Sequence, residues 1–566
     1  MRRRVVDTAG STSDATFEDA IPLGLGRRSL LKGALASAPM LLVGPSLFHP
    51  RAARAAGSTG PSTTTEPYLV PSIPGVKTVS ILTTGDSVDG YRMVGIPDGL
   101  GAFRGRRGDF TLLVNHEITA QVPGIVRAHG SAGAFVSRWR IDRRTLTVLE
   151  GQDHTPSADD VFLWDPATGR YTSGTTIWQR LCSADLPAES ALWAQGRGTR
   201  ERIFMDGEEV TQGRAWARVA TGSHTGEAWQ LPRLGRLSYE NIVASPHPQR
   251  KTVAILLDDS SINTFPDTTP LPTDFPSEVY VYIGTKGRGG HPVEDAGLTN
   301  GKLFGIKVVL QDAAQTPVAG ESNDFGLGST AFVATARFSL VELGPDGEVS
   351  NFTAEQLEQE SINKGVCRFQ RVEDGAWNPR NQDDFYFVTT ASLTANCRLW
   401  RLRFDDVERP ENGGTITILL KGDEGHRMLD NVTIDRRGRI LMDEDPGNSD
   451  RVSKIWMYLI GSGQLIQVAA HNPKFFDPTI PNNPDFLTQD EESSGIIDAE
   501  EILGKGWFLL DVQVHKPSSD PELVEGGQLL ALFVDPGIGA GRDDDHGHGH
   551  GHDDDDDDDQ GHGHGR

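Results

Sequence analysis

The sequence has 566 residues, of which 37% are hydrophobic and 23% are charged, and its formal net charge is −25 at pH 7. This length and apolar content are sufficient to bury a large globular core. The charge argues against nucleic acid as a partner, because residues 57–542 alone carry −20 and would repel phosphate backbones; the same charge suits divalent cations.

The N-terminal segment has the pattern of an export signal. In "GRRSLLKGALASAPMLLVGPSLF", residues 26–48, Arg27 and Arg28 precede an apolar run, and small residues suited to cleavage follow in "ARAAG". The run is too short for a membrane span, so none is expected. We therefore predict a twin-arginine signal peptide over residues 1–56, the twin-arginine export machinery as a partner, and a periplasmic or extracellular location.

Residues 57–74 are rich in Gly, Ser, Thr and Pro, which predicts a linker. Over residues 75–540, short runs of Val, Ile, Leu and aromatic residues alternate with Gly, Pro, Asn and Asp, as is typical of strands joined by turns. Short helices are expected near Thr353–Gln359 and Ala499–Leu503. This pattern predicts an all-β domain with long loop insertions.

The three cysteines allow at most one disulfide if the chain enters an oxidising compartment. Cys367 and Cys397 flank the predicted strand in "DDFYFVTTAS" and could pair across a hairpin. Two separate buried thiols are an equally good interpretation. Cys182 is the remaining thiol in either case.

Several predicted strands end in a polar or acidic cluster, and the spacing of these clusters fits the blades of a β-propeller. The clusters are Asn115, His116 and Glu117; Glu208 and Glu209; Asp258 and Asp259; Asp443, Glu444 and Asp445; and Asp511. In a propeller such ends meet around a central channel, and converging carboxylates need a cation. We therefore predict a metal centre that includes Glu117 and Asp443. Each cluster taken alone is also compatible with a solvated turn, and His116 with either a metal ligand or a simple hydrogen bond.

The C-terminal residues 541–566 alternate Gly and His beside a run of Asp and have no apolar surface to bury, which predicts a disordered tail. Such a tail suits weak capture of divalent cations, or it is a solvated acidic tail with incidental histidines. Motifs typical of serine hydrolases, P-loop enzymes and zinc proteases are absent from the sequence.

A series of short motifs, in this order, resembles the PhoX-type alkaline phosphatases and their relatives over roughly residues 75–535. The motifs are "VNHE" at 114–117, "LCSADLP" at 181–187, the Glu-Glu pair at 208 and 209, "LSYEN" at 237–241, "RVED" at 371–374, "LDNVTIDRRGRILMDED" at 429–445 and "FLLDVQVH" at 508–515. The resemblance implies a six-bladed propeller, twin-arginine export and a phosphomonoesterase centre with calcium and iron.

Carried over to this chain, the resemblance implies a set of site residues. Metal ligands would be Cys182, the pair Glu208 and Glu209, Glu240 and Glu373, while Arg371 would be catalytic. A thiolate with carboxylates suits iron, oxygen ligands suit calcium, and an arginine can bind a phosphate ester with two hydrogen bonds. The chain departs from the family at Gly207, where the family has a cysteine before the Glu-Glu pair, and in a longer segment after Cys182.

Two functions follow from these observations. The first is an exported, metal-dependent phosphatase that hydrolyses small phosphate monoesters. The second is a non-catalytic β-propeller that uses metal for rigidity and binds a ligand or a protein. We expect the guanidinium of Arg371 to be free near the metals in the enzyme and bound by a structural carboxylate in the binding protein.

Overall fold

The computed structural model describes residues 57–260, 277–309 and 335–539, which all belong to one compact unit, Ala52–Arg566. The predicted signal peptide and the predicted C-terminal tail lie outside the described residues, so both stay predictions. None of the described helices is long and apolar enough to cross a membrane.

Strands dominate the described part of the chain and form five large sheets. One sheet contains β6 (Pro97–Arg104), β7 (Asp109–His116), β8 (Phe135–Asp142) and β9 (Val148–Asp153). The next has the order β12 (Leu181–Asp185), β15 (Ile203–Glu208), β16 (Ala215–Val219), β17 (Ala228–Gln230), β10 (Val161–Asp165) and β11 (Arg170–Ser173).

The largest sheet has ten strands, and its two halves join through β22 and β27. The first half is β18 (Tyr239–Ala244), β19 (Lys251–Asp258), β20 (Ser277–Thr285), β21 (Lys302–Val309) and β22 (Thr335–Glu342), with β23 (Arg368–Phe369) beside β20. The second half is β27 (Gly414–Leu420), β26 (Arg398–Phe404), β25 (Asp384–Thr389) and β24 (Val372–Trp377).

Two further five-stranded sheets complete the set. One contains β28 (Leu429–Ile434), β29 (Arg439–Glu444), β30 (Lys454–Leu459), β31 (Leu465–His471) and β2 (Leu69–Pro71). The other contains β32 (Glu491–Asp498), β33 (Trp507–Val514), β34 (Gly526–Val534), β3 (Val76–Thr83) and β1 (Gly57–Thr59). Two small hairpins pair β4 (Ser87–Val88) with β5 (Tyr91–Arg92) and β13 (Trp193–Ala194) with β14 (Arg197–Gly198).

The helices are short and lie in the connections between strands. They are α1 (Glu189–Leu192), α2 (Pro292–Asp295), α3 (Ala354–Lys364), α4 (Pro473–Phe476) and α5 (Glu500–Leu503). The helix α3 begins with a capping box between Thr353 and Gln356 and ends at Gly365, whose φ of 71° is left-handed. Both helices expected from the sequence are therefore present.

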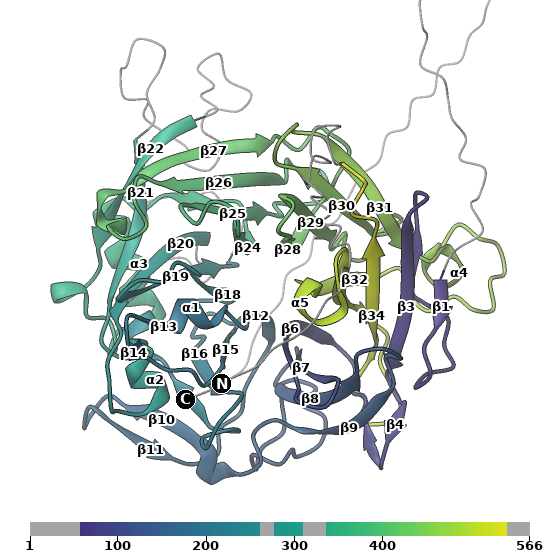
Figure 1. Ribbon diagram of the computed structural model, residues 1–566, viewed down its shortest axis with the longest axis horizontal. Coiled ribbons are helices and arrows are strands. Elements are labelled where there is room, and N and C mark those ends of the chain that lie inside the picture. The colour runs from purple at the N-terminus through teal and green to yellow at the C-terminus, as the bar shows by residue number, and fades with distance from the viewer. Residues whose placement is uncertain (1–56, 261–276, 310–334, 540–566) are drawn as a thin grey trace, which may run out of the picture. The chain divides into compact units, whose positions relative to one another are not determined.

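The innermost strands contact one another in a closed cycle that runs β6, β12, β18, β24, β28, β32 and back to β6. Figure 1 shows these strands around a common centre, with the other strands of each sheet farther out. This is the arrangement of a β-propeller, so the predicted all-β propeller is confirmed. The blade number stays a prediction, which the cycle of six innermost strands supports.

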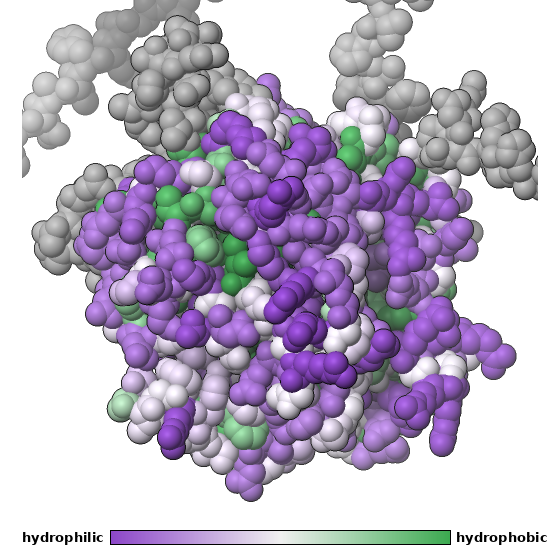
Figure 2. Space-filling model, turned by 60° about the vertical axis from the view of Figure 1, so that its left-hand side comes forward, coloured by the Kyte–Doolittle hydropathy of each residue, from purple (hydrophilic) through white to green (hydrophobic). Residues whose placement is uncertain are grey.

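The cycle is closed by pairing the two ends of the domain. The early strand β3 is antiparallel to β34, the last described strand, and completes the sheet that begins with β32. Each sheet then packs against its neighbours through apolar side chains. For example, Phe110 and Trp139 of one sheet share a buried cluster with Leu509 and Ala531 of the next. The face shown in Figure 2 is predominantly hydrophilic, because these apolar side chains are buried between sheets.

Residues 57–74, which the composition predicted to be a linker, contribute strands instead. β1 pairs with β3, and β2 pairs with β31. Hydroxyl groups hold the segment in place, since Thr78 Oγ1 donates to the carbonyl of Leu69 at 2.9 Å and Ser80 Oγ donates to that of Thr65 at 2.8 Å. The composition of residues 57–74 did not reveal this pairing, because the partner strands β3 and β31 lie elsewhere in the chain.

Candidate metal centre

The second residue of every innermost strand is a carboxylic acid or a thiol. These six residues, which we call the acid ring, are Asp98, Cys182, Glu240, Glu373, Asp430 and Glu492. Each is buried or nearly so. Because the innermost strands contact one another around the cycle, the same position in each strand reaches the same end of the channel.

A second layer of acids comes from the residue that directly follows the next strand outward. Glu117 follows β7, Glu209 follows β15, Asp259 follows β19 and Asp445 follows β29. We call these four residues the outer acids, and in the remaining two equivalent positions the chain has Thr390 and His515. A single structural position in each repeat therefore supplies each layer.

The two layers together form a nearly continuous series of potential metal ligands. Four groups of three donors have their ligand atoms within 4.8 Å of one another. The groups are Asp98, Glu117 and Cys182; Cys182, Glu209 and Glu240; Glu240, Glu373 and Asp430; and Asp430, Asp445 and Glu492. Neighbouring groups share a member, and Gln513 Nε2 joins the first group to the last by donating to Asp98 Oδ2 at 3.0 Å and to Glu492 Oε1 at 3.4 Å.

Two arginines meet these carboxylates from the start of two innermost strands. Arg180 Nη2 lies 2.6 Å from Glu117 Oε1 and 2.6 Å from Glu209 Oε2. Arg371 contacts Asp259 through Nε at 3.1 Å and Nη2 at 2.7 Å, and its Nη2 lies 3.2 Å from Glu373. The side chains of Arg180 and Arg371 are 41% and 28% exposed, so both can be reached from solvent.

The backbone at these arginines is left-handed, with φ of 42° at Arg180 and 58° at Arg371. Ile96 and Met428, which directly precede β6 and β28, have the same unusual conformation. Left-handed backbone is costly for residues other than Gly and is often found at functional sites. The same strained turn thus leads into four of the innermost strands and directs two guanidinium groups at the ligands.

Burial and mutual repulsion raise the pKa of several of these acids. Burial raises the pKa of Glu240 to about 8, and burial followed by repulsion from Glu117 raises that of Asp98 well above its usual value. The pKa of the Cys182 thiol is also raised well above its usual value, by burial and then by Asp98. Glu117 is different: burial alone would raise its pKa, but Arg180 and Gln513 lower it.

The charge and the donor chemistry of the acid ring and the outer acids both suit cations. The two arginines offset only part of the acidic charge, and Asp98 Oδ1 is buried with no hydrogen-bond partner. The donor chemistry also separates along the series. Cys182 belongs to two groups and gives them a thiolate ligand suited to iron, whereas the groups around Asp430 contain oxygen donors alone, which suit calcium.

The structure brings most of the predicted site residues together in the donor groups, whereas Glu208 and Asp443 lie outside them. Glu117, Cys182, Glu209, Glu240 and Glu373 all belong to the series of donor groups, and Arg371 lies beside it. In the described residues no disulfide joins Cys367 to Cys397, so the interpretation as two buried thiols holds.

Glu208 lies apart from the donor groups, contrary to the sequence prediction. Side chains alternate along a strand, so Glu208 faces away from the side that Glu209 takes. Its carboxylate is held by Arg214, with Nε 2.5 Å from Oε2 and Nη2 2.8 Å from Oε1. Glu209 is thus a potential metal ligand, whereas Glu208 forms a structural ion pair.

Asp443 is fully buried on β29 but belongs to none of the donor groups in the described residues; Asp445, two residues further, does. Both oxygens of Asp443 lack a hydrogen-bond partner, and burial followed by repulsion from Asp374 raises its pKa well above the usual value. His116 is equally remote, since its Nδ1 lies 3.0 Å from the carbonyl of Gly95 and its Nε2 lies 2.9 Å from Ser137 Oγ.

Sequence reasoning missed Asp98, Asp430 and Glu492. Their strands begin with polar and small residues, as in "PDGLG" and "EESSG", and lack the apolar run by which the other strands were found. A usable signal existed for Asp430, which stands in the same motif, "LDNVTI", that contributed to the family resemblance.

A large cavity lies elsewhere, at the opposite ends of the same innermost strands. Its volume is about 630 Å³, and its lining includes Arg104, Arg202, Arg436, Asp185 and Asp498. No member of the acid ring lines it. The channel therefore has two chemically distinct mouths, one acidic with two arginines and the other with charges of both signs.

Comparison with known proteins finds no family model and no curated protein that matches the sequence. Among solved structures, the chain is similar to PhoX of Pseudomonas fluorescens, solved in complex with vanadate, a transition state analogue. The TM-score is 0.54 at 12% identity, over 82% of this chain and 95% of that one.

Two further solved structures are more distantly similar. They are a protein of unknown function from Dyadobacter fermentans (TM-score 0.37, 9% identity, 82% of this chain and 100% of that one) and the β-propeller domain of the Trilobed protease from Pyrococcus furiosus (0.28, 8%, 78% and 94%). At 12% identity, the similarity to PhoX shows the fold alone.

Proposed function

We propose that this chain is a metal-dependent phosphatase that hydrolyses phosphate monoesters at the acid ring, with calcium and iron as its metals. The observation that carries the proposal is the series of donor groups that shares Cys182 and is met by Arg180 and Arg371. The similarity of fold to PhoX, a protein that binds vanadate, supports it. The N-terminal twin-arginine pattern supports export to the periplasm or beyond.

Cys182 with Asp98, Glu117, Glu209 and Glu240 would hold the iron, and the oxygen-only groups around Asp430 would hold calcium. When bound, such cations polarise phosphoryl oxygens and stabilise the charge that develops in the transition state.

The arginines would bind the substrate. A guanidinium can donate two parallel hydrogen bonds to a phosphate group, and both side chains are partly open to solvent. Asp259 and Glu373 fix the guanidinium of Arg371, and this limits its motion before the substrate arrives. Because Glu373 belongs to the ligand series, metal binding would draw its charge away from Arg371 and leave the guanidinium more available to phosphate.

The first experiment measures hydrolysis of an aryl phosphate by the full chain, with calcium and iron present and after chelation. We expect a rate that chelation removes, metal restores and vanadate inhibits. Cys182→Ala should abolish the rate, whereas Cys397→Ala, which also removes a buried thiol, should retain it because Cys397 lies outside the donor groups.

A second variant tests the substrate-binding role. Arg371→Lys keeps the positive charge but loses the paired donors, so we expect a higher KM and a lower kcat/KM, by about tenfold to a hundredfold for a lost charge-assisted contact of about 1.5–3 kcal/mol. An unchanged KM would remove Arg371 from the site.

The alternative is a non-catalytic, metal-braced propeller that binds a ligand or a protein. One observation favours it: Arg371 is held by two carboxylates in this structure, as expected for a binding scaffold. If the full chain binds metal and hydrolyses no aryl phosphate under any metal condition, this alternative becomes the better account.

A further inference from the structure

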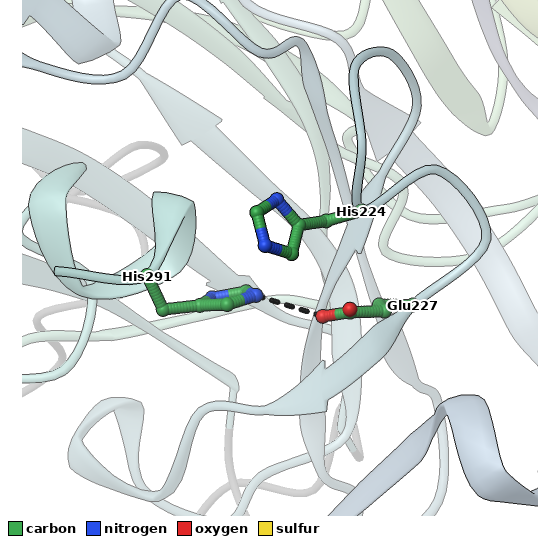
Figure 3. A group of neighbouring side chains, drawn as sticks. All are labelled: His224, Glu227 and His291. Carbon is green, nitrogen blue, oxygen red and sulfur yellow. Dashed lines mark hydrogen bonds and ion pairs between the residues drawn. The ribbon is translucent and has the colours of Figure 1, made fainter.

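A second group of metal-ligating side chains lies outside the channel. It consists of His224 and Glu227, from the connection between β16 and β17, and His291, which directly precedes α2. Figure 3 shows the two imidazole rings and the carboxylate turned toward one another from separate elements. The group shares no residue with the acid ring or the outer acids, so it is independent of the proposed function.

The three side chains are already close. Their ligand atoms lie within 4.8 Å of one another, His291 Nε2 is 2.7 Å from Glu227 Oε2, and the two ring centres are 4.7 Å apart. The ligand atoms of a tetrahedral zinc ion with bonds of about 2.0–2.1 Å are about 3.3 Å apart. Rotation of partly exposed side chains is sufficient to close this difference, since His224 is 36% exposed.

Neighbouring side chains orient the ligands by hydrogen bonds and packing, as they commonly do around metal ions. Glu201 lies 3.3 Å from His224 Nδ1, so it can accept the Nδ1 proton and leave Nε2 for a metal. Trp229 packs against the His291 ring at 4.3 Å and donates through Nε1 to Glu227 Oε2 at 2.8 Å. The pair of Glu201 and His224 thus lies beside the pair of Glu227 and His291. These hydrogen bonds and ring contacts fix the side chains more closely than is usual for polar residues that meet by chance at a surface.

His291 needs one adjustment. Its Nδ1 accepts a long hydrogen bond of 3.3 Å from the backbone N–H of Val293. Binding of a metal by Nε2 of a neutral ring would put the proton on Nδ1 and remove that bond. The change is small, because the Val293 N–H lies in the first turn of a four-residue helix. Backbone N–H groups in this position have no partner within the helix and commonly donate to water.

We propose that His224, Glu227 and His291 bind one transition-metal ion, of which Zn²⁺ fits best. Two imidazoles and one carboxylate suit zinc, and three protein ligands leave a fourth position for water or a further ligand. His224 and Glu227 belong to the sheet of β15–β17, and His291 lies between β20 and β21 of the next sheet. The metal therefore cross-links two neighbouring sheets at the surface.

The test counts zinc bound by the full chain after equilibrium dialysis at buffered free Zn²⁺. We expect His224→Gln and His291→Gln each to hold one zinc fewer per chain than the unsubstituted protein. The tail and the channel are identical in all these proteins, so their zinc cancels in the difference. Glu201→Gln should keep that zinc but bind it about 10–100-fold more weakly, as expected when a carboxylate that orients a histidine ligand is lost.

His247→Gln is the matched control. His247 is also partly buried and lies 3.0 Å from a carboxylate, that of Glu408, but it has no second histidine nearby in any donor group of the described residues. It should hold as much zinc as the unsubstituted protein. Equal zinc in all variants would overturn the proposal, as would an equal loss in His247→Gln.

Folding of each variant is checked by circular dichroism without metal. Should His291→Gln fail to fold, His224→Gln decides the question, because His224 lies in a partly exposed loop. Visible absorption of bound Co²⁺ gives an independent reading: a tetrahedral spectrum that is lost in His224→Gln supports the site, and one that persists contradicts it.

Discussion

His116 and Glu117 show how neighbouring residues come to have unrelated roles. His116 is fully buried on β7, stacked at 4.4 Å on Phe135, with both ring nitrogens within hydrogen-bond distance of protein oxygens. Burial lowers its pKa to about 3. Glu117 turns into the channel and joins the ligand series. The imidazole is thus held neutral by packing, with no part in metal binding.

This predicts a pH dependence of stability. Because the pKa of His116 is about 3 when folded and about 6.5 when unfolded, the unfolded chain takes up a proton below pH 6.5 that the folded chain refuses. The free energy of unfolding therefore falls as pH drops from 6.5 toward 3, by about 2 kcal/mol at pH 5 from this residue.

Urea unfolding of the unsubstituted protein and His116→Gln at pH 7.5 and pH 5 measures this effect. The variant should be less stable at pH 7.5 but should lose less on acidification. The other buried histidines of the described residues, which are His129, His154, His426 and His471, contribute equally to both proteins. Equal losses in the two proteins would show that His116 titrates normally in the folded chain.

Among the secondary-structure elements, the innermost strands require close approach of their neighbours. A Cβ at Gly207 of β15 would lie 2.3 Å from the Cβ of Tyr239, the residue before Glu240 in β18. Tyr239 cannot yield easily, since it is fully buried and its hydroxyl donates to the carbonyl of Leu234 at 2.9 Å. A side chain at position 207 would therefore push β18 and move Glu240 with it.

We expect Gly207→Ala to destabilise the protein by about 1–3 kcal/mol, as overpacking usually does, and to weaken metal binding at the acid ring. Gly461→Ala is the control, because a Cβ there meets nothing within 4 Å; its effect should be within about 0.5 kcal/mol. Thermal unfolding with and without calcium measures both effects. Equal melting temperatures for the two variants would mean that β15 and β18 can move apart freely.

The sequence predicted elements better than it predicted which way their residues face. Outer strands such as β7 and β19 were found from their apolar runs, and a helix was expected near Thr353–Gln359, where α3 lies. Alternation puts Glu208 and Glu209 on opposite sides, but which of them faces the channel depends on register, and β12 and β15 have an irregular register between Leu181 and Ala184. No pattern in a single strand reveals such an irregularity. Asp98 and Glu492 were missed because polar innermost strands have no apolar signature.

At the scale of the whole molecule, carboxylates from residues 98 to 492 meet at one end of the channel. Without metal, burial raises the pKa of Glu240 to about 8 and, with Glu492, that of Asp445 to about 7. The unfolded chain loses these protons near pH 4, whereas the folded, metal-free chain keeps them up to pH 7–8. The contribution of these two acids to the free energy of unfolding of the metal-free protein therefore falls as pH rises from about 4 to 8.

Chelation should consequently lower the melting temperature much more at pH 8 than at pH 5.5. Cations need deprotonated ligands, so the metal contributes most to stability at pH 8. At this pH Glu240 and Asp445 no longer stabilise the metal-free protein by holding their protons. The loss of stability that the buried histidines cause at low pH is the same with and without metal, so it cancels in the comparison. Melting curves with EGTA, and with calcium-saturated EGTA as the control, test this; an equal loss at the two pH values would contradict metal binding at the acid ring.

The pairing of β3 with β34 also sets an order of events during biosynthesis. β3 leaves the ribosome well before its partner β34, at residues 526–534, has been made. The other sheets can form one after another, but the ring of sheets stays open until β34 is available. Gln513, which connects the two ends of the ligand series through Asp98 and Glu492, is also made late in this order. We therefore expect metal loading to wait until β34 has been made, and a chain that stops before β34 to keep folded sheets around an incomplete centre.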